Sequence, residues 1–158
     1  MGYFTRVFCS TNRKPKISGI LKHLKSDGFD LSVNLTESEL DDENWTDFEL
    51  TYDKARLPLL VELNTKGESE RLAEEELEEF FEIIGKPKFF ELNKKKVIKH
   101  LKATEYIVCI QLPTSDIIDK GYDLNGELMA YIELNFSGMV QADKEGFYLR
   151  NELLFELK

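Results

Sequence analysis

The segment TEYIVCIQLP at residues 104–113 constrains the fold most, because apolar residues follow one another there almost without interruption. A short run rich in Ile, Val and Tyr is typical of a strand that is buried on both faces. Such a strand occupies the middle of a sheet rather than its edge. The sequence therefore predicts a sheet built around residues 104–113.

Four earlier segments also have strand patterns. Residues 3–10 are rich in aromatic and β-branched side chains, residues 29–35 and 45–53 alternate apolar with polar positions, and residues 57–64 form the return strand after a turn. Pro58 has no backbone N–H to donate, so the last of these strands should begin at Pro58 or lie at a sheet edge. Alternation of this kind predicts strands with one buried face.

Apolar spacing of three and four residues predicts helices between these strands. The first helix begins near Ile17 and ends at Gly28, and a second covers residues 69–85 with Ser69 as its N-cap. A third helix follows from Asn93 as its cap. The order of elements in the first half is then β-α-β-β-β-α.

The segment NGELMAYIELNFSG at residues 125–138 fits two structures. Leu128, Ala130 and Ile132 alternate as in a strand, whereas Asn125 and Gly138 stand where a helix N-cap and a C-terminal glycine belong. This punctuation favours the helix. Short strands joined by turns complete the chain.

These elements predict an α+β fold with a mostly antiparallel sheet and helices packed on one face of it. The chain has 158 residues, 42% of them hydrophobic and 32% charged, which fits a single globular domain over residues 1–158. No segment approaches the apolar length of a membrane span. The N-terminus lacks the pattern of a signal peptide, so we expect a cytoplasmic protein.

Charge is distributed in blocks along the chain. The net charge is −9, yet residues 27–85 hold nineteen acids and four bases, and residues 86–105 hold seven lysines and two glutamates. An acidic surface repels nucleic acid and anionic lipid, so neither is an expected partner. The acidic block is explained by a solvated helix face, by pairing with the lysines of residues 86–102, or by a basic partner protein. The candidate partner-binding residues are Glu75, Glu78 and Glu82.

Cysteine and histidine do not form a recognisable site in the sequence. Cys9 and Cys109 lie in apolar runs and are expected to be free, buried thiols. His23 and His100 stand singly, each beside a lysine, and are expected at the surface. Because no CxxC or HxxxH spacing occurs, we predict neither a metal site nor a cofactor.

The stretch QADKEGFY at residues 141–148 has the composition of a hairpin turn, with Gly146 at a position of positive φ. The segment DIIDKGYDLNGE at residues 116–127 fails the EF-hand pattern and is expected to be a turn-rich loop. If the two regions meet, their carboxylates can surround a cation or a basic group beside an aromatic wall. The candidate ligand-binding residues are Asp119, Asp123, Asp143, Glu145 and Tyr148.

No nucleotide-binding, hydrolase or phosphatase motif is present, so the sequence does not point to an enzyme. We expect a small acidic protein-interaction module, of the inhibitor or immunity type, that binds a basic partner protein. The alternative is a small enzyme or a ligand-binding or cation-binding protein that uses the carboxylates of the C-terminal loops. The oligomeric state does not follow from the sequence.

Overall fold

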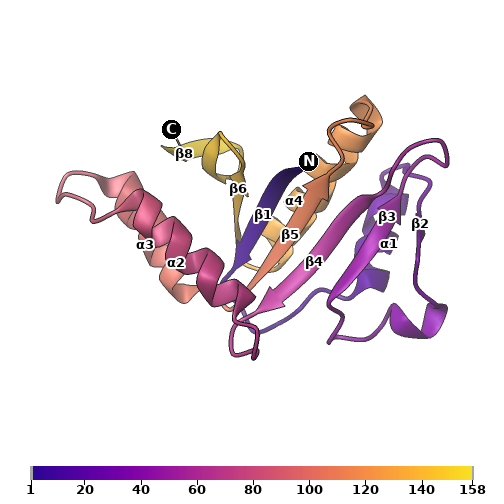
Figure 1. Cartoon of the computed structure of the whole chain (residues 1–158), viewed down its shortest axis with the longest axis horizontal. Coiled ribbons are helices and arrows are strands. Elements are labelled where there is room, and N and C mark those ends of the chain that lie inside the picture. Colours follow the sequence, from indigo (N-terminus) through magenta and orange to yellow (C-terminus); the bar gives the residue numbers. More distant parts are fainter. Residues whose placement is uncertain (1, 158) are drawn as a thin grey trace.

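A computed structural model describes residues 2–157 of the chain. Within these residues, four α-helices surround one antiparallel sheet of eight strands (Figure 1), so the predicted α+β class is confirmed. The elements are β1 (Tyr3–Cys9), α1 (Ile17–Ser26), β2 (Ser32–Val33), a 3-10 helix (Glu37–Glu39), β3 (Asp47–Thr51), β4 (Leu59–Thr65), α2 (Leu72–Ile84), α3 (Leu92–Ala103), β5 (Tyr106–Leu112), α4 (Asp119–Asn135), β6 (Gly138–Ala142), β7 (Gly146–Leu149) and β8 (Glu152–Glu156).

The strands lie in the order β2-β3-β4-β5-β1-β6-β7-β8. The first strand therefore sits in the middle of the sheet, with β5 on one side and β6 on the other. In the register, Arg6 lies opposite Cys109 of β5 and opposite Gln141 of β6. The expectation that residues 104–113 form a central strand is confirmed, and so is the predicted order of the first six elements.

The helices cover both faces of the sheet, so the prediction that they pack on one face is wrong. Val7 of β1 contributes to an apolar core with α1 and α4, whereas its neighbour Phe8 contributes to a second core with α2 and α3. Successive side chains of a strand point to opposite faces. Since β1 and β5 carry apolar side chains on both faces, a helix layer on one side would leave the other exposed to water.

The two helix layers are offset diagonally across the sheet. The core under α1 and α4 reaches from β3 to β1, while the core under α2 and α3 reaches from β5 to β8. Figure 1 shows α1 and α4 behind the strands and α2 and α3 to one side. Two half-faces stay open: the front of β3 and β4, and the rear of β6 and β7.

Several predicted caps and one predicted loop are wrong. Helix α2 begins after Arg71 rather than at Ser69, and α3 begins one residue before Asn93. Helix α4 already begins at Asp119, so most of the expected loop at residues 116–127 is helical, and Asn125 is a buried residue inside the helix rather than its cap. The helical interpretation of residues 125–138 is otherwise confirmed.

Glycine inside α4 has a packing reason. A Cβ atom at Gly121 would lie 2.7 Å from the Tyr52 hydroxyl, so only glycine lets the helix approach this ring so closely. The sequence pattern of a loop rich in Gly, Asp and Asn was misleading here because tertiary packing outweighs local helix propensity.

Residues 143–145 form the predicted turn between β6 and β7, and Gly146 has a φ of 151°. A Cβ atom at Gly146 would collide with the carbonyl oxygen of Phe155 in β8. We therefore expect Gly146→Ala to lower the free energy of unfolding by more than about 2 kcal/mol in urea titrations. The control is Lys144→Gly, because Lys144 has a φ of 62° and glycine adopts it freely; it should leave stability unchanged or raise it. Equal changes in the free energy of unfolding of the two variants would show that Gly146 is not required for its close contact with Phe155.

Candidate functional site

A large groove lies on the rear half-face, between α4 and strands β1, β6 and β7. Its volume is about 760 Å³, within the range of small-molecule sites. Its walls are mostly apolar, with Met129 and Leu134 of α4 facing Val140 of β6. The polar residues along it are Tyr3, Thr5, Thr114, Tyr122, Asn125, Glu133, Glu145, Tyr148, Arg150 and Asn151.

Glu145 is held at the rim of this groove by two tyrosines. The hydroxyl groups of Tyr3 and Tyr148 both donate to its carboxylate, Tyr148 at 3.0 Å. Burial and the contact with Glu145 raise the pKa of Tyr3, and the hydrogen bond to Glu145 raises the pKa of Tyr148. Both phenols therefore keep their protons at neutral pH, which leaves Glu145 as an oriented acceptor between two aromatic rings.

The floor of the groove has one buried polar pair. Thr5 donates through its hydroxyl to the Asn125 side-chain oxygen at 3.1 Å, and both residues are almost inaccessible. Within residues 2–157 the Asn125 amide nitrogen has no hydrogen-bond partner, although Asn125 lines the groove. The floor thus offers a donor to an entering ligand.

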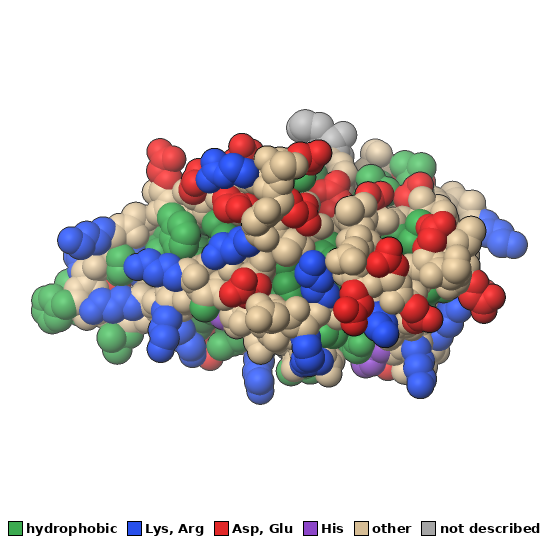
Figure 2. All heavy atoms as spheres, turned by 90° about the horizontal axis from the view of Figure 1, so that it is seen from below, with side chains coloured by type: hydrophobic (Ala, Val, Ile, Leu, Met, Phe, Trp, Pro, Cys, Tyr) green, Lys and Arg blue, Asp and Glu red, His purple; other side chains and the backbone are tan. Residues whose placement is uncertain are grey.

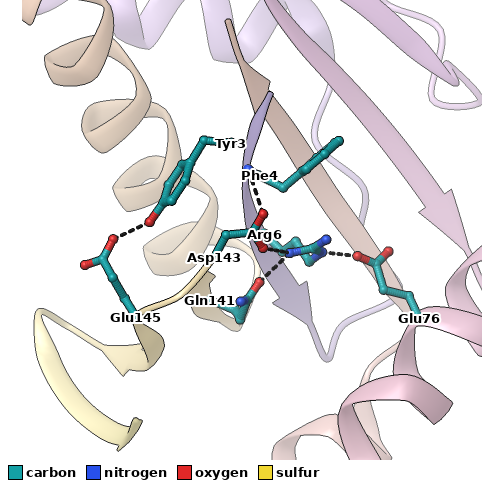
Figure 3. A network of polar contacts seen from close by, with 7 residues as sticks. All are labelled: Tyr3, Phe4, Arg6, Glu76, Gln141, Asp143 and Glu145. Carbon is teal, nitrogen blue, oxygen red and sulfur yellow. Dashed lines mark hydrogen bonds and ion pairs between the residues drawn. The ribbon is translucent and has the colours of Figure 1, made fainter. Parts of the chain in front are cut away.

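Asp143 is not among the residues that line this groove, and Figure 3 shows it pointing toward Arg6, whereas Glu145 points toward Tyr3. The Arg6 guanidinium donates to Asp143 at 2.9 Å and to Gln141 at 2.7 Å, and it also pairs with Glu76 of α2. The Asp143 carboxylate additionally accepts from the backbone N–H of Phe4 at 3.1 Å. This network fastens α2 and the β6–β7 turn to the central strand.

The Arg6 network is largely shielded from solvent. The Arg6 side chain is 15% exposed and lies over the rings of Phe4 and Phe80. Burial alone lowers the pKa of Arg6, but the charge of Glu76 and the hydrogen bond to Asp143 raise it overall. Burial is the largest effect on the pKa of Glu76 and raises it; Arg6 lowers it, Glu79 and Glu62 raise it, and the pKa is raised overall. The Asp143 carboxylate thus contacts Arg6 and the Phe4 N–H of the central strand.

The five candidate ligand-binding residues therefore do not converge. Glu145 and Tyr148 share the groove, and Asp143 belongs to the Arg6 network. Asp119 and Asp123 lie on the first turns of α4, outside the residues that line the groove. Asp123 instead borders a separate hollow. Tyr3 and Asn125 were missed as groove residues, because neither stands near Glu145 in the sequence.

The front half-face carries a row of exposed acids. Asp47 and Glu49 of β3 and Glu62 of β4 point outward, and Asp47 lies directly opposite Glu62 in the register. Figure 2 shows Asp and Glu gathered in its upper part, which is the side that faces the viewer in Figure 1, and Lys and Arg toward the left and lower borders. The alternation of apolar and polar residues in β3 already predicts from the sequence that Asp47 and Glu49 are exposed.

Helix α2 extends this row. Glu75, Glu78 and Glu82 are exposed, and Glu78 pairs with Arg71 at 3.1 Å. Within the described residues, neither Glu75 nor Glu82 makes an ion pair, and no acid of α2 pairs with a lysine of residues 86–102. Glu62 and Glu79 both raise the pKa of Glu76, so the sheet and helix acids are neighbours. We call these exposed carboxylates the acidic face: Asp47, Glu49, Glu62, Glu75, Glu78, Glu79 and Glu82.

The two cysteines are free and buried, as expected. Cys9 lies opposite Tyr106 and Cys109 lies opposite Arg6, so they occupy different positions along the same strand pair. Burial raises the pKa of each thiol to about 12. Both stay protonated at neutral pH and lack the thiolate that a nucleophile requires.

His100 is not the surface residue that the sequence predicts. It is partly buried, and a ring nitrogen lies 2.6 Å from the Phe8 carbonyl oxygen. Burial lowers its pKa, so the neutral ring is favoured in the folded protein. His23, by contrast, is 38% exposed and stacks on Tyr131.

Comparison with known proteins identifies no relative: no family model, no curated protein and no solved structure matches the chain. Within residues 2–157, none of the helices combines the length and apolar character needed to cross a bilayer. The two open half-faces of the sheet are therefore the candidate binding surfaces.

Replacing Arg6 by methionine tests the structural role of its network. Arg6→Met keeps the apolar stem but leaves two partly buried carboxylates without a counter-charge, and we expect it to cost about 2 to 4 kcal/mol of unfolding free energy at pH 7. Arg71→Met is the control, because Arg71 is 56% exposed and pairs with Glu78 at the surface. It should change stability by less than about 1 kcal/mol. Urea unfolding measures both, and similar losses would show that the Arg6 network is no more important than a surface pair.

Proposed function

We propose that this chain is a non-catalytic binding module that recognises a basic partner protein through its acidic face. The observation that carries the proposal is the direct cross-strand opposition of Asp47 and Glu62, next to the acids of α2. Like charges in this position destabilise a sheet. A basic partner offsets that repulsion, whereas the isolated protein gains no stability from it.

The acidic face also adjoins an apolar hollow. Leu57 and Leu60 are 52% and 40% exposed there, beside Pro58 and Glu49, in a depression of about 330 Å³. Complementary charge accelerates association, while affinity comes mainly from apolar side chains that are buried at the centre of an interface. A basic partner that inserts one apolar side chain beside Leu60 would use both features. An inhibitor or immunity-type protein that captures a basic target fits this combination.

A charge reversal tests the acidic face. The wild-type protein should capture a basic partner from its own cells at low salt, and high salt should weaken this binding. The double variant Glu62→Lys with Glu82→Lys should no longer capture that partner. The control is Glu152→Lys with Glu156→Lys on β8, which changes the net charge equally at exposed positions elsewhere.

Captured proteins are identified by mass. The proposal would be contradicted if the wild-type protein captured no basic protein, or if both double variants lost the captured protein equally. Stability provides an internal check, because Glu62→Lys removes the repulsion from Asp47. We expect the free energy of unfolding of this single variant to be about 0.5 kcal/mol higher than that of the wild-type protein. The double variant must also show the wild-type unfolding transition before its loss of capture is counted.

A second candidate function is the binding of a small molecule in the rear groove. It is favoured by the position of Glu145 and Tyr148 at one rim of the same 760 Å³ groove. Apolar walls with a few oriented polar groups are typical of such sites. The Asn125 amide nitrogen can donate a hydrogen bond to a ligand, and the Glu145 carboxylate can accept one. A mostly apolar molecule with one hydrogen-bond acceptor and one donor would fit these two groups.

A screen of small amphipathic molecules by melting temperature tests the groove. Compounds that bind there should raise the melting temperature of the wild-type protein but not of Met129→Trp, whose larger side chain occupies the groove, and they should act more weakly on Glu145→Gln. Glu156→Gln is the control and should respond like wild type. A screen without compounds that follow this pattern would rule out the groove as a ligand site.

A further inference from the structure

A cluster of nitrogen and oxygen donors lies where the C-terminal end of α1 meets the first half of α4. His23 and Asp27 stand one helical turn apart on α1, and Glu127 reaches them from α4. One donor atom of each lies within 4.8 Å of the others. His23 Nε2 and Asp27 Oδ2 lie 3.2 Å apart.

We propose that His23, Asp27 and Glu127 bind a divalent transition-metal ion of the zinc type. Ligand bonds to zinc are about 2.0 to 2.2 Å long, so two ligands of a tetrahedral centre lie about 3.3 Å apart. The separation of the His23 and Asp27 donors matches this edge. Asp27 and Glu127 are exposed, so their side chains are free to turn toward a common ion. The ion binds the lone pair of Nε2 in the neutral imidazole, whose single N–H proton then lies on Nδ1.

The charged residues that line the hollow beside the cluster are carboxylates. Asp27, Asp123 and Glu127 border one hollow, together with Tyr122 and Phe29, and no lysine or arginine lines it. Within residues 2–157, none of these three carboxylates pairs with a lysine or arginine. The negative end of the α1 dipole lies at Asp27, where the helix ends, and adds to this potential. The local field therefore attracts a cation, with Asp123 as a further oxygen at the edge.

The histidine determines which cation fits. Its ring stacks on Tyr131, with 4.7 Å between the ring centroids, and this contact limits its orientation. Imidazole nitrogen together with carboxylate oxygen suits zinc and similar ions, whereas calcium and magnesium prefer oxygen ligands alone. Three protein ligands leave the fourth tetrahedral position to water, so the site would hold its ion exchangeably.

Calorimetric titration of the full chain, without a histidine tag, into zinc chloride tests the site. We expect one zinc ion per chain with an affinity in the micromolar range, together with a rise in melting temperature. His23→Gln and Glu127→Gln should each weaken zinc binding by at least about ten-fold. The matched controls are His100→Gln and Asp119→Asn, which remove a histidine and an α4 carboxylate outside the cluster and should bind zinc like wild type.

The selectivity of the site is tested by the same titration with calcium and magnesium, which should bind more weakly than zinc. Zinc binding only at millimolar concentration, unchanged affinity in both His23→Gln and Glu127→Gln, or calcium binding as tight as zinc would each overturn the proposal. Melting curves are first recorded without metal. A variant is compared in the titration only if it shows the same unfolding transition as the wild-type protein, so that weaker zinc binding is not caused by unfolding.

Discussion

The antiparallel pairing of β1 with β5 is the constraint on which the rest of the structure depends. Both strands carry apolar side chains on both faces, as Val7 and Phe8 illustrate, so helices have to pack on both sides of them. Four helices do not cover both faces of eight strands. The two helix layers meet only over the central strands and are offset beyond them, and each layer leaves half of one face open to solvent.

The open half-faces differ in chemistry because different strands form them. On the front of β3 and β4 the exposed positions are mostly acids around Leu60, and on the rear of β6 and β7 tyrosines and apolar residues line a groove beneath α4. Arg6 lies between these regions, and its pairs with Glu76 and Asp143 hold α2 and the β6–β7 turn in position. The same central strand thus determines the borders of both candidate binding surfaces.

The candidate site was only partly predictable from the sequence. Glu145 and Tyr148 lie near each other in the chain and on one turn and strand, so their shared location follows from local structure. Asp143 stands two residues from Glu145, yet it pairs with Arg6 on the central strand and points elsewhere. A polar residue in a turn has several directions open to it, and long-range partners select one.

The sequence by itself determined the strands, most of the helices, the β6–β7 turn and the acidic block, because these depend on local periodicity, turn chemistry and composition. Tertiary structure alone decided which layer buries each apolar face, since a strand pattern shows that a face is buried but not what covers it. It also decided that His23 and Asp27 meet Glu127, and that Asp47 meets Glu62. Such contacts depend on strand order and helix placement, which only the packing of the whole core selects.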